Sequence, residues 1–179
     1  MIAEEKTPAT AQTKPTPIPF QIRKLGHVVF YVSDMERSVR FYTEILPFKV
    51  TDVNEHGMVF LCCATDHHTL ALAPRPNAVQ PPADYLKISH FALEVSSFDD
   101  LFRIRDWLRE HNVTITFEGR KGPGGNPGVE FLDPDGYTIE LYAGMDQIGW
   151  DGRSRPSSGW RRVKSLEDAA ANPLPPPSE

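Results

Sequence analysis

The chain has 179 residues, of which 40% are hydrophobic and 24% are charged, and its formal net charge is −5. This size fits one domain, and the composition is that of a globular protein, which excludes collagenous, coiled-coil and wholly disordered classes. The negative charge argues against a nucleic-acid partner bound by charge neutralisation. No apolar run approaches the roughly 20 residues needed to span a membrane, and the first twenty residues lack the apolar stretch of a signal peptide. We therefore expect a cytoplasmic protein without a membrane partner.

Proline marks both ends of the expected domain, since four of the 17 prolines lie in residues 1–20 and five in residues 145–179. Segment 1–21 is polar and without periodicity, which predicts disorder. In the C-terminal extension, 145–179, two tryptophans are costly to leave in water, so we expect its first part to pack on the body or on a partner and its end to be disordered. The folded domain is then expected over residues 22–144.

The domain reads as an internal repeat, with one module at 24–74 and a second at 86–143. Each module opens with a strand-like segment, GHVVFYV and then SHFALEV, and the two align with His27 on His90. An amphipathic helix pattern follows each strand, DMERSVRFYTEIL and then SFDDLFRIRDWLREH. The spacing of apolar residues along these segments predicts two helices with Asp34 and Ser97 as N-caps.

Three further strand-like segments close each module: FKVTDVNE, GMVFLCCA and HTLALAP in the first, VTITFEG, GVEFLDP and YTIELYA in the second. Asp135-Gly136 predicts a tight turn between the last two, and the glycine-rich GRKGPGGNPG predicts a longer loop in the second module. The fold class expected is α+β, with two tandem βαβββ modules forming a curved mixed sheet around a metal pocket.

Three residues of this repeat are candidate metal ligands. His27 and His90 occupy equivalent positions on the two opening strands, and Glu140 lies on the last strand of the second module. Taken one at a time, each is more often an ordinary strand residue. Their symmetric placement on strands that present one face to a common pocket favours a site, because two imidazoles and a carboxylate suit Fe(II), Mn(II), Co(II), Ni(II) or Zn(II).

The repeat, the opening histidine of each module and the hairpin FLDPDGYTIEL resemble the vicinal oxygen chelate superfamily. This superfamily includes glyoxalase I, fosfomycin-resistance transferases, bleomycin-binding proteins and type I extradiol dioxygenases. The resemblance covers about residues 22–143, and it implies that His27, His90 and Glu140 fall on the family's ligand positions. The segment MDQIGWDGRSRPSSGWRR in turn resembles the C-terminal extension of proteins classed with extradiol ring-cleaving dioxygenases.

Ala71 separates the activities that this resemblance implies. Glyoxalase I-like sites take a ligand from the last strand of each module, and the first-module equivalent of Glu140 is Ala71, which cannot bind a metal. Three protein ligands leave three adjacent positions of an octahedron open for a bidentate substrate and O₂. The leading hypothesis is therefore an Fe(II)-dependent extradiol-type dioxygenase that cleaves a catechol-like aromatic substrate with O₂.

Two other functions stay open. Fosfomycin-type transferases also use three ligands, so a lyase, transferase or isomerase that acts on a chelating substrate without O₂, with Mn(II), Ni(II) or Zn(II), is the first alternative. A non-catalytic small-molecule-binding protein is the second. The fold implies a homodimer, and two arrangements are compatible with it: a site within one chain, and a site built from the halves of two chains.

The residues expected to assist catalysis depart from the extradiol pattern. That pattern has a tyrosine ten residues before the ligand glutamate and a histidine about nine residues earlier, where this chain has Glu130 and Lys121. Glu130 is a candidate general base for a phenolic proton, and Lys121 a candidate partner of an anionic substrate. A solvent-facing strand glutamate and a solvated loop lysine are the plain alternatives. Tyr31 shares the face of His27 by strand alternation and is expected to line the pocket. His67 or His68, expected to be exposed in a hairpin turn, would supply the missing acid–base histidine if it folded inward.

Overall fold

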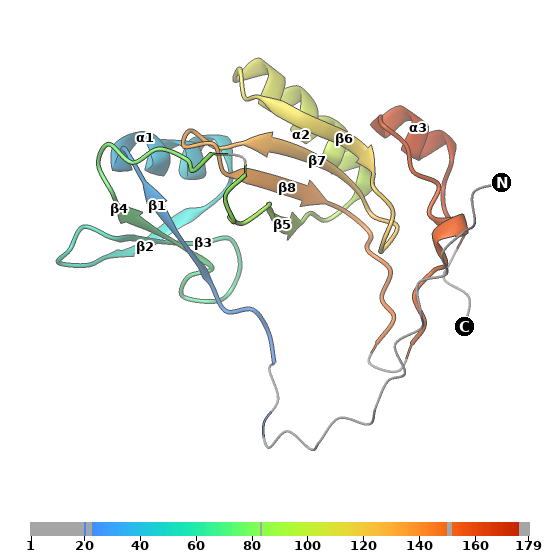
Figure 1. Ribbon diagram of the computed structural model, residues 1–179, viewed down its shortest axis with the longest axis horizontal. Helices are drawn as coiled ribbons and strands as arrows, with labels where there is room; N and C mark the ends of the chain where they lie inside the picture. Colours follow the sequence, from blue (N-terminus) through green and yellow to red (C-terminus); the bar gives the residue numbers. More distant parts are fainter. Residues whose placement is uncertain (1–19, 21–22, 83, 150–151, 176–179) are drawn as a thin grey trace.

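The computed structural model describes residues 20, 23–82, 84–149 and 152–175, and it contains two modules that each form a four-stranded mixed sheet (Figure 1). The segment predicted to be disordered, 1–21, lies outside the described residues except for Phe20, and so does Trp150 of the extension. No helix in the described part of the chain is both long enough and apolar enough to cross a membrane.

The first module has the expected βαβββ order. Its elements are β1 (Val28–Val32), α1 (Met35–Arg40) with a π-helical continuation η1 (Phe41–Ile45), β2 (Lys49–Val53), β3 (Val59–Cys62) and β4 (Leu70–Pro74). The sheet order is β1-β4-β3-β2, in which β1 runs parallel to β4 and the other pairs are antiparallel.

The second module repeats this topology. Its elements are β5 (Phe91–Glu94), α2 (Phe98–Glu110), β6 (Ile115–Arg120), β7 (Pro127–Leu132) and β8 (Thr138–Tyr142), in the order β5-β8-β7-β6. The predicted α+β fold of two tandem βαβββ modules is confirmed. The hydrogen-bonded strands form two separate sheets, with β1 and β5 each at an edge, where the sequence predicted a single curved one.

Both helices start where the sequence predicts. The Asp34 carboxylate accepts a hydrogen bond from the Arg37 N–H at 3.0 Å, and Ser97 Oγ accepts one from the Asp100 N–H at 3.2 Å. Such side chains satisfy N–H groups that the first helical turn leaves without partners.

A single hydrophobic core joins the two modules. Phe30 of β1 is 2% exposed, and its ring centroid lies 5.1 Å from that of Phe91 on β5 and 4.4 Å from that of Tyr137 beside β8. Leu101 and Leu108 of α2 are fully buried in the same cluster. The modules therefore pack through the face of β1 that carries Phe30 and the face of β5 that carries Phe91.

The turn between β7 and β8 adds a polar connection across this interface. Buried Asp133 accepts hydrogen bonds from the Tyr42 hydroxyl at 2.9 Å and from two N–H groups of its own turn. Asp135 accepts hydrogen bonds from Ser33, from Arg37 at 2.7 Å and from Ser38 at 3.2 Å, all on or beside α1. Burial raises the pKa of Asp133, while the hydrogen bonds it accepts oppose that shift.

The C-terminal extension packs along the free edge of the second sheet. It contains the 3-10 turn η2 (Ser157–Gly159) and the helix α3 (Leu166–Ala171), which lies beside β6 (Figure 1). Ser165 caps α3 by accepting a hydrogen bond from the Asp168 N–H, and Leu166 is fully buried.

Replacing Asp133 by alanine should lower the free energy of unfolding by about 2–4 kcal/mol, because one buried hydroxyl and two backbone N–H groups lose their acceptor. Tyr42→Phe removes only one of these bonds and should cost about 1 kcal/mol. Urea denaturation measures both values, with Asp84→Ala, on the exposed linker, as the control. Equal stability of Asp133→Ala and the control would contradict the importance of this turn.

Candidate metal centre

Three predicted site residues of the second module converge. His90, Glu130 and Glu140 each offer a ligand atom, and these atoms all lie within 4.8 Å of one another. Strand register explains the convergence, since Glu130 on β7 is paired directly with Glu140 on β8, and Glu140 is paired with Ala92 on β5. His90 is two residues from Ala92, so strand alternation puts all three side chains on one face of the sheet.

The two carboxylates of this group are largely buried and differently partnered. Glu130 is 6% exposed, and the Lys121 ammonium forms an ion pair with it. Glu140 Oε2 lies 3.3 Å from His90 Nε2, and Asn126 Nδ2 donates a hydrogen bond to Glu140 Oε1 at 3.4 Å. Two adjacent carboxylates thus share a single ammonium group.

This arrangement favours a cation at Glu140. Burial raises the pKa of the Glu140 carboxyl group, and the neighbouring Glu130 charge raises it further, while His90 and Lys121 act in the opposite direction. A divalent cation would offset both the lost hydration and the repulsion between carboxylates. One imidazole and two carboxylates form a donor set suited to Fe(II), Mn(II) or Zn(II), so the residues fit a metal.

A glycine makes room for the ligand carboxylate. Gly128 lies on β7, and a Cβ atom there would stand 2.7 Å from Glu140 Oε1, closer than real Cβ contacts occur. Any side chain at this position would displace the Glu140 carboxylate.

His27 lies outside this group and within a different cluster. Its ring centroid is 4.7 Å from that of His68, which in turn packs edge-on against Phe60 at 5.0 Å. His67 is exposed as expected, but His68 is half-buried and covers the His27 side of the first sheet. Ala71 is 1% exposed and is paired with Val29 and Phe60, so the first-module equivalent of Glu140 lies among apolar side chains.

The ligand-bearing faces of the two modules point away from their common core. On β1, Phe30 faces the second module, while Val29 and Tyr31 alternate to the other side and are 44% and 54% exposed. His27 shares that outer side by strand alternation, as His90 does relative to Phe91. His27 and His90 both border a cavity of about 420 Å³, but neither carboxylate of the group borders it.

Tyr31, like His27, lies outside the group formed by His90, Glu130 and Glu140. Its ring lies under the Arg75 guanidinium, whose carbon is 4.1 Å from the ring centroid, and its carbonyl accepts a hydrogen bond from the Tyr137 hydroxyl. Among the predicted catalytic residues, the structure therefore brings Glu130 and Lys121 to the carboxylate group and leaves Tyr31 on the outer face of the first module.

Comparison with known proteins identifies the family. The model of the Glyoxalase/Bleomycin resistance protein/Dioxygenase superfamily matches residues 24–141. The chain belongs to this superfamily. It is 28% identical over 142 residues to the metallothiol transferase FosB of Staphylococcus saprophyticus, covering 75% of this chain and 87% of that protein.

Two further relatives of this superfamily member have other activities in their names. It is 39% identical over 138 residues to the biphenyl-2,3-diol 1,2-dioxygenase of Paraburkholderia xenovorans, covering 73% of this chain but only 42% of that protein. The solved structure of the trypanothione-dependent glyoxalase I of Leishmania major is 30% identical, with a TM-score of 0.52 over 68% of this chain and 87% of that one. Relatives thus include both dioxygenases and transferases.

Sequence reasoning did not single out Gly128 or Asn126, which touch Glu140. Both lie at the end of the glycine-rich stretch that the sequence marks only as a loop. Their roles depend on the β7–β8 register, which sets a residue of β7 opposite each residue of β8.

Gly128→Ala should weaken binding of a divalent cation about tenfold while the fold is kept, because the added methyl group displaces the Glu140 carboxylate. Isothermal titration with Mn²⁺ measures the affinity. Gly144→Ala is the matched control: its φ of +65° strains an alanine, yet nothing lies within 4 Å of the added Cβ. That variant should lose stability without losing Mn²⁺ affinity, and equal affinity losses in both variants would contradict the steric argument.

Proposed function

We propose that this superfamily member is an Fe(II)-dependent dioxygenase of the extradiol type, which opens the ring of a catechol-like substrate beside its two hydroxyl groups. The observation that carries the proposal is buried Ala71, which stands where a fourth ligand would be needed. With His27, His90 and Glu140 as the ligands, the protein would supply three donors. Three donors leave adjacent positions for a bidentate diol and O₂. The identity with a biphenyl-2,3-diol dioxygenase supports the same reaction.

The residues of the chain have distinct roles in this proposal. The two histidines and Glu140 hold the metal, which when bound supplies the position at which the diol and O₂ meet. Glu130, buried beside Glu140 and in an ion pair with Lys121, accepts the proton of a phenolic hydroxyl group. Tyr31 borders the substrate on the outer face of the first module.

We infer that His27 reaches the metal from a second copy of the chain in a homodimer. In one chain His27 lies outside the group formed by His90, Glu130 and Glu140, and neither carboxylate borders the cavity that His27 and His90 share. The outer face of β1 is apolar and exposed at Val29 and Tyr31, as expected of a surface that a second copy covers. The second module of one copy would then face the first module of the other.

The main alternative is a metal-dependent thiol transferase that does not use O₂, with Mn(II), Ni(II) or Zn(II). The observation that favours it is the share of each relative's length that matches this chain, which is 87% for the FosB relative but 42% for the dioxygenase relative. Against it, the Lys121 charge is already neutralised by Glu130, which weakens attraction for an anionic substrate. A small-molecule-binding protein without a metal is the third reading, and the convergence of His90, Glu130 and Glu140 counts against it.

Protein loaded anaerobically with Fe(II) should consume O₂ when given a catechol panel and produce a yellow ring-cleaved product. Glu140→Ala should reduce this turnover at least a hundredfold without unfolding, because one of three ligands is lost. An oxygen electrode and absorbance spectroscopy measure both effects. No uptake by protein shown to contain iron, together with thiol consumption in the presence of Mn²⁺ and an electrophile, would favour the transferase.

Subunit complementation tests whether the metal site is shared between two chains. A heterodimer of His27→Ala and Glu140→Ala chains contains one site with all three ligands and one with neither His27 nor Glu140. Co-expression should therefore restore metal binding, at about one ion per heterodimer, whereas each variant alone binds weakly. Ligands contributed by one chain only would give no restoration, and that outcome would contradict the shared site. Two co-expressed wild-type chains are the control for co-expression.

A further inference from the structure

The C-terminal extension holds the main chain next to the metal group at three consecutive residues. Arg120, the last residue of β6, exchanges two backbone hydrogen bonds with Val163 of the extension, at 3.0 and 3.1 Å. The next carbonyl group, that of Lys121, accepts a hydrogen bond from Arg162 Nε at 2.8 Å. Gly122 then packs directly under the Trp160 ring.

Glycines on both sides of Lys121 allow this close approach. A Cβ atom at Gly119 would lie 2.3 Å from the Val163 carbonyl oxygen, and one at Gly122 would lie 2.7 Å from a carbon of the Trp160 ring. Both residues have positive φ angles, +128° and +138°, which side chains rarely adopt. The local sequence is thus suited to receive the extension against the backbone.

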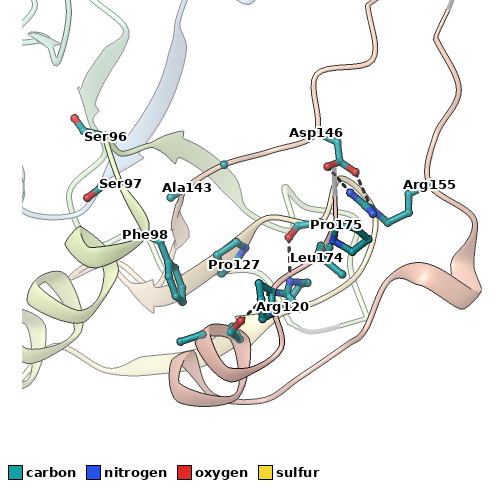
Figure 2. A pocket seen from close by; sticks show the side chains of 15 residues that line it. Ser96, Ser97, Phe98, Arg120, Pro127, Ala143, Asp146, Arg155, Leu174 and Pro175 are labelled. Atoms are coloured by element: carbon teal, nitrogen blue, oxygen red, sulfur yellow. Dashed lines mark hydrogen bonds and ion pairs between the residues drawn. The ribbon is translucent and has the colours of Figure 1, made fainter. Parts of the chain in front are cut away.

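The Arg120 side chain holds the extension through hydrogen bonds to its carbonyl groups. The side chain is 4% exposed, and its guanidinium donates hydrogen bonds to the carbonyl oxygens of Gly125, Arg161, Ala169 and Asn172 at 3.0–3.2 Å. Figure 2 shows it beside α3, next to a cavity of about 570 Å³ that Asp146 and Arg155, joined in a bidentate ion pair, also line. Burial lowers the pKa of Arg120. Carbonyl groups at the C-terminal end of a helix stabilise such a buried cation.

Lys121 follows Arg120 but points the other way. Because Arg120 is directed to the extension, the ammonium group of Lys121 reaches the metal side of the sheet, where it pairs with Glu130 and lies 5.0 Å from the centroid of the Phe117 ring. The extension therefore fixes the backbone of residues 120–122, and the Lys121 side chain extends from this segment to the metal group.

We propose that the C-terminal extension is a positioning element of the metal centre: by fixing residues 120–122 it holds the Lys121 ammonium against Glu130, and this limits the attraction of Glu130 for a divalent cation. Lys121 and Arg162 are positioning residues in this scheme. It rests on the metal centre proposed above, and it gives the extension a role in setting the charge of that centre.

The test compares Mn²⁺ affinities of full-length variants by isothermal titration. Lys121→Met removes a positive charge beside Glu130 and should raise the affinity about tenfold. Arg162→Gln releases the Lys121 carbonyl and should raise it severalfold in the same direction. The double variant should match Lys121→Met alone, because both changes act through one ammonium group.

Arg161→Gln is the matched control for charge and for docking of the extension, since its side chain contacts the Pro173 carbonyl and not residue 121. It should leave Mn²⁺ affinity within twofold of the wild-type value. A purely structural extension would give Arg162→Gln a lower Tm with unchanged affinity, and that result would overturn the proposal, as would equal affinity gains in both arginine variants. Absence of Mn²⁺ binding by the wild-type protein would overturn the metal centre itself, and the proposal with it.

Limited acetylation read by mass spectrometry reports the position of Lys121 without any metal. Arg162→Gln should increase the modification of Lys121 severalfold relative to exposed Lys164 in the same sample. Unchanged modification of Lys121 would contradict its restraint by the extension.

Discussion

The aspartates of the β7–β8 turn control how the rest of the protein is arranged. Asp133 and Asp135 accept eight hydrogen bonds from seven donor groups, which belong to their own turn and to residues on or beside α1. Buried carboxylates are stable only when their oxygen atoms are satisfied in this way. The same turn joins the strands that carry Glu130 and Glu140, so one polar contact fixes both the module interface and the metal-binding hairpin.

This interface has a consequence for the location of the active site. With α1 held to the β7–β8 turn, Phe30 packs on Phe91 and Tyr137, and the opposite faces of β1 and β5 remain outside. Residues that alternate along a strand cannot reach both faces. In one chain His27 lies outside the group formed by His90, Glu130 and Glu140, which is why we propose that a second copy completes the ligand set.

Charge balance dominates the metal group itself. Glu130 and Glu140 are opposite each other on adjacent strands, where like charges repel, and the ammonium group of Lys121 forms an ion pair with Glu130. The pKa of Glu140 is raised by burial and by the Glu130 charge, although His90 and Lys121 oppose the shift. Two features affect this charge balance. Gly128 leaves space for the Glu140 carboxylate, and the C-terminal extension fixes the backbone of Lys121.

The sequence by itself determined the two βαβββ modules, because helix periodicity, strand alternation and the capping residues Asp34 and Ser97 are local signals. It also placed His90, Glu130 and Glu140 on strands of the second module, where alternation and hairpin pairing bring them together. The separation of His27 from that group, the division into two sheets, and the contacts of Gly128 and Lys121 were decided by tertiary structure alone. These features depend on which faces of the modules pack together and on where the extension crosses β6, and a local pattern contains no information about contacts between segments distant in the chain.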